Sequence, residues 1–344
     1  MGLNPAYRLI ANSEDITAII RERFKQLRYS DDAGLESDML EIDLSDHDPD
    51  NPIQTPPTGA ELELFLGYDG AAQRMGLFVV DEIEFRGWPG ELRIIAHAAP
   101  FDVSTGGKEN LQTQKTRSWD KGTTIGAMVA KIAKEHGMEP AVSPSLKSVA
   151  LPHLDQSDES DMHFLVRLAR KYDAIVKPAG GKIVVVKHGE TKTTSGEDLP
   201  AVTLEPGDVT RFSVIRSTRE NSGMVVASWH ENRKAKRHLV KVGKGEPVAR
   251  LRRQYSTREM ALAAATAELD KRQRGKASLS LSMPGRTDLQ AEAPLTLEGF
   301  RDGVAGDWVI RRVEHVMTAD GYACTLDAEL PNSGDTADVE EVTE

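Results

Sequence analysis

Cysteine is almost absent from this sequence, because Cys324 is the only one among 344 residues. A disulfide framework within the chain is therefore excluded, and so is a metal site built on several thiolates. Cys324 lies in an apolar alternating run, which favours a buried cysteine in a strand.

Basic residues are outnumbered by acidic ones: 43 Lys and Arg stand against 54 Asp and Glu, which gives a net charge of −11. A nucleic-acid-binding protein usually has a basic surface that dominates such counts. We expect no specific nucleic-acid partner and no binding to an anionic membrane. The basic run Arg233–His238 lacks interleaved aromatic residues, and we interpret it as a hairpin tip or a contact with an acidic neighbouring subunit.

Long apolar runs are missing as well. None approaches the roughly 18 residues that a membrane span needs, and Met1–Tyr7 does not begin a secretory signal. We expect synthesis and assembly in the cytoplasm, without membrane insertion.

Sequence motifs of catalysis are missing too. The nine histidines form no His-x-x-x-His or His-Glu-x-x-His pattern, and His97, His136 and His315 are expected to be structural. Gly106-Gly107-Lys108 and Gly180-Gly181-Lys182 lack the remaining residues of a phosphate-binding loop. The Gly-x-Ser-x-Gly motif of many hydrolases does not occur.

An acidic cluster of Asp155, Asp158, Glu159 and Asp161 lacks the ligand spacing of a calcium loop. Negative charge before a helix is typical of capping, which we expect here. The sequence thus predicts no catalytic, cofactor-binding or metal-binding residues and a protein that is not an enzyme.

Alternating apolar residues predict strands over most of the chain. In residues 1–112 the alternation is clear at Asp38–Leu44, Glu61–Leu66, Gly76–Phe85 and Glu91–Ala98. The proportion of apolar residues, 39%, is sufficient for real hydrophobic cores.

Helical periodicity begins after residue 113. Thr123 or Thr124 is expected to cap a helix that ends at Gly137, with the apolar stripe Ile125, Met128, Val129 and Ile132. A second helix is predicted to start near Ser157/Asp158, and a hairpin to turn at Gly180-Gly181.

The remainder of the chain returns mainly to strands. Thr210–Ser217 and Met224–His230 are predicted to pair with each other. A capping box, Ser256-x-x-Glu259, is expected to open an alanine-rich helix. The last twelve residues are acidic without a basic residue, and we expect them to be disordered.

A weak internal repeat joins the two β-rich parts. Gly76–Glu84 recurs as Gly306–Glu314, about 230 residues later, and Leu64–Tyr68 recurs as Thr296–Phe300. Such a chain contains two similar β units, so three chains could form a ring of six by heterologous contacts.

The repeat also inverts a charge, since Asp81 and Glu82 are replaced by Arg311 and Arg312. One hypothesis is that this inversion disfavours contacts between like units. The alternative is that these are unrelated solvent-facing positions.

Motifs over more than 300 residues carry a resemblance to one protein family. They are Asp15-Ile16-Thr17, Leu40-Glu41-Ile42-x-Leu44-x-Asp46, Gly76-x-Phe78-Val79-Val80-Asp81, Trp119, Ile132-Ala133-x-x-His136-Gly137, Gln156-Ser157-x-Glu159-Ser160-Asp161-x-x-Phe164-Leu165-x-Arg167-Leu168-Ala169, Tyr255-Ser256, Ala263-Ala264-Ala265 and Gly306-x-Trp308-x-Ile310-x-x-Val313-x-His315. In this order they resemble the late control protein D family, the hub proteins of contractile-tailed phages and R-type pyocins.

The resemblance implies a fold that is mainly β with an α/β insertion. Two similar tube-type β-barrel domains per chain would form a trimeric, pseudo-six-fold ring. The expected domains are a first tube-type barrel at 1–112, an inserted α/β domain at 113–200, a second tube-type barrel with one helix at 201–332, and an acidic disordered tail at 333–344.

The function implied is that of a structural baseplate hub, a homotrimer that adapts the six-fold tail tube to the three-fold central spike. The implied partners are the tube or tube-initiator protein, the spike, other baseplate proteins and the tape measure protein. The type VI secretion protein VgrG shares this hub module but fuses it to a spike. No β-helical repeats follow here, so a separate spike polypeptide is expected, in a phage virion or a bacteriocin particle (tailocin).

Two alternatives remain from other classes: a tail-associated peptidoglycan hydrolase, and the hub of a type VI-like secretion system. Residues Asp31–Asp50 also leave a choice open, since they include nine acidic residues and no basic one. They are either a solvated surface or part of the wall of a channel that repels DNA.

Overall fold

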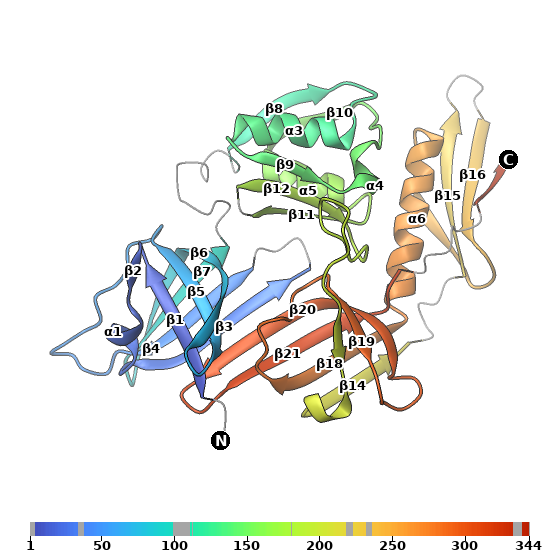
Figure 1. Ribbon diagram of the computed structural model, residues 1–344. Helices are drawn as coiled ribbons and strands as arrows, with labels where there is room; N and C mark the ends of the chain where they lie inside the picture. The colour runs from blue at the N-terminus through green and yellow to red at the C-terminus, as the bar shows by residue number, and fades with distance from the viewer. Residues whose placement is uncertain are drawn as a thin grey trace.

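The computed structural model describes residues 4–33, 38–98, 111, 113–179, 181–217, 223–231, 236–332 and 339–343. Its fold is mainly β, as the sequence predicts (Figure 1). No helix in these ranges is long and apolar enough to cross a membrane.

The first part of the chain is almost entirely strand. Its elements are β1 (Pro5–Ala11), β2 (Glu14–Asp15), α1 (Thr17–Ile20), β3 (Phe24–Asp32), β4 (Met39–Ser45), β5 (Glu61–Tyr68), β6 (Ala71–Arg86) and β7 (Glu91–Ala98). On β4 the apolar residues Leu40, Ile42 and Leu44 are buried while the residues between them are not. The predicted alternation is therefore confirmed here.

The middle part is a compact α/β unit. Its elements are β8 (Gln114–Trp119), α3 (Ile125–Glu135), β9 (Glu139–Val142), α4 (Pro144–Lys147), β10 (Leu154–Ser160), α5 (Asp161–Ala169), β11 (Ala174–Ala179) and β12 (Lys182–Lys187). Thr124 caps α3 by accepting from the Ala127 amide, and Gly137 has φ +68°, so both predicted ends of this helix are confirmed.

The last part is again mainly strand. Its elements are β13 (Val202–Leu204), the 3₁₀ turn η1 (Pro206–Asp208), β14 (Arg211–Arg216), β15 (Met224–Glu231), β16 (Lys236–Gly243), β17 (Val248–Tyr255), α6 (Arg258–Arg274), β18 (Ala277–Pro284), β19 (Pro294–Leu297), β20 (Gly306–Thr318), β21 (Tyr322–Glu329) and β22 (Val339–Thr343).

One sheet of 13 strands joins the two ends of the chain. Its main path is β14-β18-β21-β20-β3-β4-β7-β6-β5-β1-β2, with β19 and β13 attached to β20. The link between the two halves is the antiparallel pair β3–β20. Among the described residues the path does not close on itself, so two separate closed barrels are not seen.

The same strand order occurs twice within this sheet. The path β3-β4-β7-β6-β5-β1 in the first half corresponds to β14-β18-β21-β20-β19-β13 in the second. Neighbours are antiparallel in both, except that β19–β13 is parallel where β5–β1 is antiparallel. The internal repeat seen in the sequence is thus also a repeat of topology.

The two long strands of the repeat share an irregularity. A bulge lies between Val80 and Glu82 in β6 and between Ile310 and Arg312 in β20. The amides of Val80 and Ile310 donate to the carbonyls of Ala60 and Ala293, at 2.9 and 3.0 Å. A bulge bends a strand at a fixed point, so its recurrence at one position supports a common origin.

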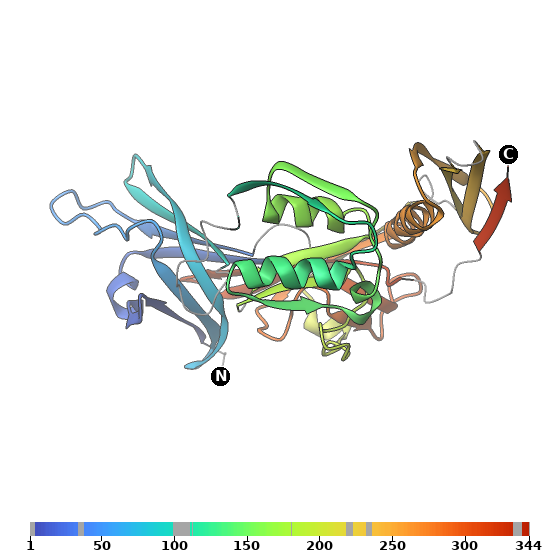
Figure 2. The same ribbon diagram turned by 90° about the horizontal axis from the view of Figure 1, so that it is seen from above.

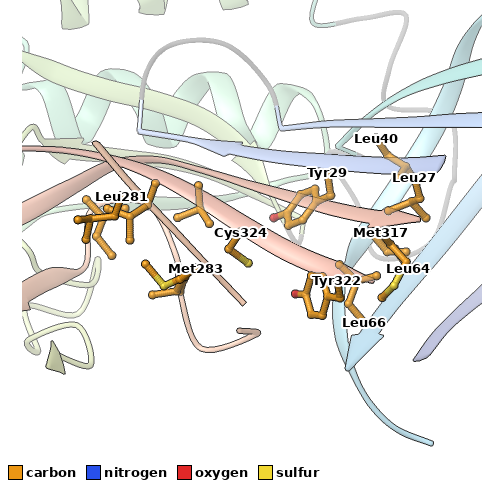
Figure 3. Packing of buried hydrophobic residues seen from close by; sticks show 14 of the residues in the cluster. Leu27, Tyr29, Leu40, Leu64, Leu66, Leu281, Met283, Met317, Tyr322 and Cys324 are labelled. Carbon is orange, nitrogen blue, oxygen red and sulfur yellow. The ribbon is translucent and has the colours of Figure 1, made fainter. Parts of the chain in front are cut away.

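A single hydrophobic core fills both halves of the long sheet. It runs from Leu9 of β1 to Ala328 of β21. Figure 3 shows its middle, where Leu27 and Tyr29 of β3 lie near Met317 of β20 and Tyr322 of β21. The two halves are therefore packed as one body, while the α/β unit has a separate core.

A third, small core lies beside the second half. The four-stranded sheet β17-β15-β16-β22 is covered by α6, whose buried residues Ala261, Ala265 and Leu269 recur every four positions (Figures 1 and 2). The predicted pairing of Thr210–Ser217 with Met224–His230 is wrong, because β14 pairs with β18 and β15 pairs with β16 and β17.

The end of the chain differs from the prediction. Residues 339–343, expected to be disordered, form β22 and pair with β16. The acidic residues Glu340 and Glu341 lie 3.1 and 2.8 Å from Lys241 and Arg258. Basic partners on the neighbouring elements thus compensate the charge that suggested disorder.

Two helices begin later in the chain than the sequence predicts. Residues 157–160 belong to β10, where Glu159 and Ser160 pair with β8 after a bulge at Ser157 and Asp158, and Ser160 caps α5. Thr257, not Ser256, caps α6 by accepting from the Met260 amide at 3.3 Å. The predicted hairpin is confirmed as β11–β12.

Candidate functional site: the polar face of the long sheet and its buried joints

The long sheet has one apolar face and one polar face. Alternation sends every second residue away from the core, and paired residues on neighbouring strands share a face. The polar face includes Arg28, Glu41, Asp43, Arg93, Glu314, Thr325, Ser278, Ser280 and Ser282. It crosses the β3–β20 link, with Val316 opposite Arg28 and Ile95 opposite Glu41 as apolar members, so one mainly polar face extends over both halves of the sheet.

Ion pairs balance the charge of this face. Arg93 contacts both carboxylate oxygens of Asp43, at 2.6 and 3.0 Å, and this hydrogen bonding raises the pKa of the guanidinium. Arg28 lies 3.6 Å from Glu41 and 3.0 Å from Glu314. The acidic run Asp31–Asp50 is therefore largely paired with bases distant in the sequence, and the surface is mixed in charge.

A first joint, half-buried, holds the α/β unit against the sheet. Lys177 of β11 lies 2.6 Å from Asp38 and 3.9 Å from Asp31, and it also donates to the Asp32 carbonyl. The Asp31 carboxylate accepts from the Ala291 amide at 2.8 Å, so it also touches the second half. Burial and the neighbouring Asp38 raise the pKa of Asp31 to about 6, while Lys177 opposes the shift.

A second buried joint connects three parts of the chain. Arg274, at the end of α6 and 2% exposed, lies 2.7 Å from Asp173 and 2.8 Å from Glu329. His188, just after β12, lies 3.0 Å from both Glu292 and Glu329. Burial opposes protonation of His188, but hydrogen bonds to these two carboxylates prevail and raise its pKa to about 10. The imidazole is therefore charged.

A third network lies inside the α/β unit, around Asp161. This side chain is buried and accepts from His136 at 2.7 Å and Gln156 at 2.8 Å, and also from Lys115 and Arg117. Burial alone would raise the pKa of Asp161, but hydrogen bonds from Lys115, Gln156 and His136 hold it at about 2. The helix-terminus interpretation holds for Asp161 in part: its carboxylate lies in the first turn of α5, where negative charge favours the helix dipole, while the Ser160 hydroxyl supplies the side-chain cap.

The remaining acidic residues of that cluster pair with individual partners. Asp155 accepts from Ser118 at 2.6 Å, Asp158 from Thr116 at 2.8 Å, and Glu159 from Arg167 at 2.9 Å. Groups of three or more acidic, histidine or cysteine residues able to hold a metal do not occur within the described ranges.

His315 and Cys324 lie together in the main core. The Cys324 sulfur is 3.2 Å from His315 Nδ1, which also contacts the Tyr322 hydroxyl at 2.8 Å. Burial lowers the pKa of His315 to about 4 and raises the pKa of Cys324 to about 11. Neutral imidazole and thiol groups are the expected state of such core residues. His97, in contrast, is exposed and lies 2.6 Å from Asp81.

Other sequence motifs have plain structural positions. Gly181 turns between β11 and β12 with φ +74°, while Gly106-Gly107-Lys108 lies outside the described residues. Of the basic run, Lys236 and Arg237 open β16, and His238 stacks on Trp229 with ring centroids 4.4 Å apart.

A depression that the sequence did not reveal lies between the α/β unit and α6. Its volume is about 270 Å³, and Lys171, Tyr172, Arg253 and Glu268 are among the residues that line it. Burial lowers the pKa of Lys171. Its walls come from α6, β17 and the loop after α5, elements that only tertiary packing brings together.

The sequence matches a described family of known proteins, "Phage tail baseplate hub (GPD)", over residues 39–321. Two similar proteins are each named "Probable baseplate hub protein". That of Escherichia phage 186 is 34% identical over 96% of this chain and 94% of its own length. That of Escherichia phage P2 is 33% identical over 99% of this chain and 96% of its own length.

Solved structures share the fold at low sequence identity. The 43 kDa tail protein of prophage MuSo2 from Shewanella oneidensis has a TM-score of 0.70 at 11% identity, over 97% of this chain and all of that one. An Escherichia coli component of the type VI secretion system, reported as similar to the phage T4 tail proteins gp27 and gp5, has a TM-score of 0.55 at 11% identity, over 92% of this chain and 76% of that one. The resemblance inferred from the sequence motifs is confirmed by the family match, and the chain belongs to the phage tail baseplate hub family.

Proposed function

We propose that three copies of this baseplate hub protein form a ring of six similar units, which joins a six-fold tail tube to a three-fold central spike. The observation that carries the proposal is the strand order that occurs twice in one chain, with a bulge at the same position in β6 and β20. Two similar units per chain and three chains supply six similar surfaces on one side and three on the other.

The proposed partners follow from this position. They are two more copies of the chain, the tail tube or tube-initiator protein, the spike protein, other baseplate proteins and the tape measure protein. Specific nucleic acid and membrane are not among them. Assembly would take place in the host cytoplasm, and the finished protein would reside in the tail baseplate of the particle.

The proposed domain division is a first tube-type β-barrel at 1–112, an inserted α/β domain at 113–200 and a second tube-type barrel at 201–332. The separate core of residues 111–185 supports the insertion. The β3–β20 link indicates that the two barrel units act as a continuous sheet.

In such a ring the polar face of the long sheet would line the channel. Serines of β18 and ion pairs such as Asp43–Arg93 give this face polarity without a strong field of one sign. A passing DNA or protein chain would then find few fixed charges free to bind it.

The proposed role is structural and without enzymatic activity. A peptidoglycan hydrolase is the alternative from another class, and release of soluble fragments from purified cell wall, abolished by one point mutation, would favour it. The fold similarity to a type VI secretion component keeps a secretion-system hub as a second candidate. Neighbouring genes for tail sheath, tube and a separate spike would decide for the phage-type hub.

The mass of the purified chain in solution tests the ring. Light scattering should give three times the chain mass of 37.7 kDa. A species that stays at 37.7 kDa at every concentration would contradict the homotrimer.

A further inference from the structure

Among the strand edges of the long sheet that have no partner in the described chain are those of β14 and of the end of β6. β14 ends the sheet and pairs only with β18. On β6, residues 82–86 pair with β7 on one side, whereas the pairing with β5 stops at Val79. Unpaired edges present free N–H and C=O groups and readily accept another strand.

These edges also hold most of the exposed apolar side chains. Six large apolar residues are exposed among those described, and four of them lie on or beside the two edges. They are Phe85 at 67%, Trp88 at 92%, Phe212 at 46% and Ile215 at 65% exposure. Exposed apolar residues gathered in this way are typical of an interaction surface.

The chain contains an internal template for how such edges combine. In the β3–β20 link His315 lies opposite Tyr29, and Met317 opposite Leu27. All four side chains are buried, and His315 stacks on Tyr29 with ring centroids 5.3 Å apart. This link joins β3 of the first repeat to β20, the long strand of the second repeat.

The repeat assigns the two free edges to the same positions. In the first half the paired residues run Val80, Ala96, Leu40, Tyr29 across four strands. In the second half they run Ile310, Ala328, Leu279, Val214. β14 is therefore the counterpart of β3, and β6 is the counterpart of β20.

The burial of the large apolar counterparts on the core face diverges where a partner strand is missing. Before the bulge, Phe78 is 1% exposed and its counterpart Trp308 is 2% exposed. After the bulge, His315 is fully buried in β20 where this strand pairs with β3. Its counterpart Phe85 in β6, which has no such neighbouring strand, is 67% exposed. Both long strands thus carry a large side chain at this position, but only His315 of β20 has a neighbouring strand that buries it.

We infer that β14 of one copy pairs antiparallel with β6 of the next copy, repeating between chains the β3–β20 link within a chain. Transfer of the internal register sets Phe85 opposite Val214 and Ile83 opposite Arg216. The contact is heterologous, so it repeats head to tail, and in the proposed homotrimer it closes after three copies. This inference rests on the homotrimer proposed above, and it names the surfaces that make it.

Pairing of β14 with β6 of the same molecule is excluded by their positions in the sheet. β14 and β6 are separated by β18, β21, β20, β3, β4 and β7 in the sheet, and Figure 1 shows them at opposite ends of it. The repeat therefore specifies a second copy of the chain as the partner. That copy offers β14, the counterpart of β3, to the edge of β6, the counterpart of β20.

Cysteine pairs test the register. In F85C/V214C the two new thiols should lie within disulfide reach across neighbouring copies. Mild oxidation should then give covalent dimers and trimers on non-reducing gels. The matched control is F85C/I215C, where the second thiol points to the opposite face, and its yield should be about tenfold lower. The native Cys324 is buried and remains in all variants.

A charge on the edge tests the interface without cross-links. Phe85→Lys should fold, because the side chain is solvent-exposed in the single chain, and should convert the trimer to monomer. Val339→Lys, at a site 46% exposed on the separate four-stranded sheet, should remain trimeric.

The possible results of these experiments distinguish the β6–β14 pairing from the homotrimer itself. A trimer by mass in which F85C/V214C forms no more cross-link than F85C/I215C, or in which Phe85→Lys leaves the mass unchanged, overturns the β6–β14 pairing and leaves the homotrimer standing. A wild-type chain that is monomeric at every concentration overturns the homotrimer and the pairing with it. Cross-linking of either cysteine variant to a different baseplate protein alone would assign the edge to that partner instead.

Discussion

At the scale of single residues, the ionised groups with the strongest constraints lie where parts of the chain meet. Arg274, His188 and Glu329 connect α6, the α/β unit and the second half of the sheet, and Lys177 connects that unit to the first half. Removing one partner of a buried ion pair leaves an uncompensated charge, which costs far more than the pair contributes. These residues therefore fix orientation, which is the property a structural hub needs.

Asp161→Asn is predicted to destabilise the α/β unit. The carboxylate is fully buried and faces Arg117, Lys115 and His136. Without its charge the Arg117 and Lys115 cations lose their counter-charge, at a cost of about 3 kcal/mol. Urea unfolding, followed by hydrogen exchange of the α3 and α5 amides, measures it. Asp158→Asn is the matched control, because Asp158 lies at the surface, and a loss as large there would contradict this explanation.

His188 predicts a pH dependence above neutrality. Its pKa of about 10 in the folded chain exceeds the 6.5 of an unfolded histidine. A raised pKa means that the folded state binds the proton more tightly, so the stabilisation is full below pH 6.5 and is lost as pH rises towards 10. The difference in unfolding free energy between wild type and His188→Gln should shrink by about 1.4 kcal/mol per pH unit in that window. A constant difference from pH 6 to 10 would contradict the assignment.

At the scale of elements, local patterns were sufficient for most strands and for the cap of α3. They failed where tertiary partners decide the outcome. Residues 157–160 have helix-capping composition, but the pairing of Glu159 and Ser160 with β8, beyond a bulge, makes the segment part of a strand. The sequence also aligned Leu64 with Thr296, whereas strand register matches Leu64, opposite Gly76, with Leu297, opposite Gly306. A one-residue gap reverses the face of every side chain, and only the pairing reveals it.

The charge inversion between the repeats can now be placed. Arg312 lies opposite Asp32 in the β3–β20 link, and its counterpart Glu82 lies at the free edge of β6. If β3 of one copy paired with β6 of another, Glu82 would face Asp32 and the like charges would repel. The inversion thus favours β3–β20 over the competing β3–β6 pair.

Exchanging these charges is predicted to disturb assembly. The double variant Glu82→Arg/Arg312→Glu removes the repulsion from the wrong pair and adds it to the right one. We expect species other than the trimer in light scattering, with the size distribution broadened at low ionic strength and restored by salt. A trimer unchanged by the exchange would support the alternative, that these positions are unrelated.

At the scale of the whole molecule, the duplicated topology could be anticipated from the sequence, but the continuous sheet that joins the two copies could not. Sequence suggested two independent β units, whereas β3 of the first is inserted beside β20 of the second and both share one core. The satellite sheet of β15, β16, β17 and β22 was also not anticipated, because β22 lies in an acidic segment whose basic partners are distant in sequence. Long-range pairing is the information that local patterns lack.

This shared core predicts how the chain can be divided. Residues 113–187 expressed alone should fold, since their apolar residues pack among themselves around Met128, Phe164 and Val176. Residues 4–98 alone should not, because Leu27 and Tyr29 would lose Met317 and His315 and be exposed along an unpaired β3 edge. Circular dichroism with thermal melting measures both fragments: a cooperative transition is expected for the first and none for the second. A stable, monomeric fragment 4–98 would show that the first β unit is independent and that the continuous sheet is a contact between two finished domains.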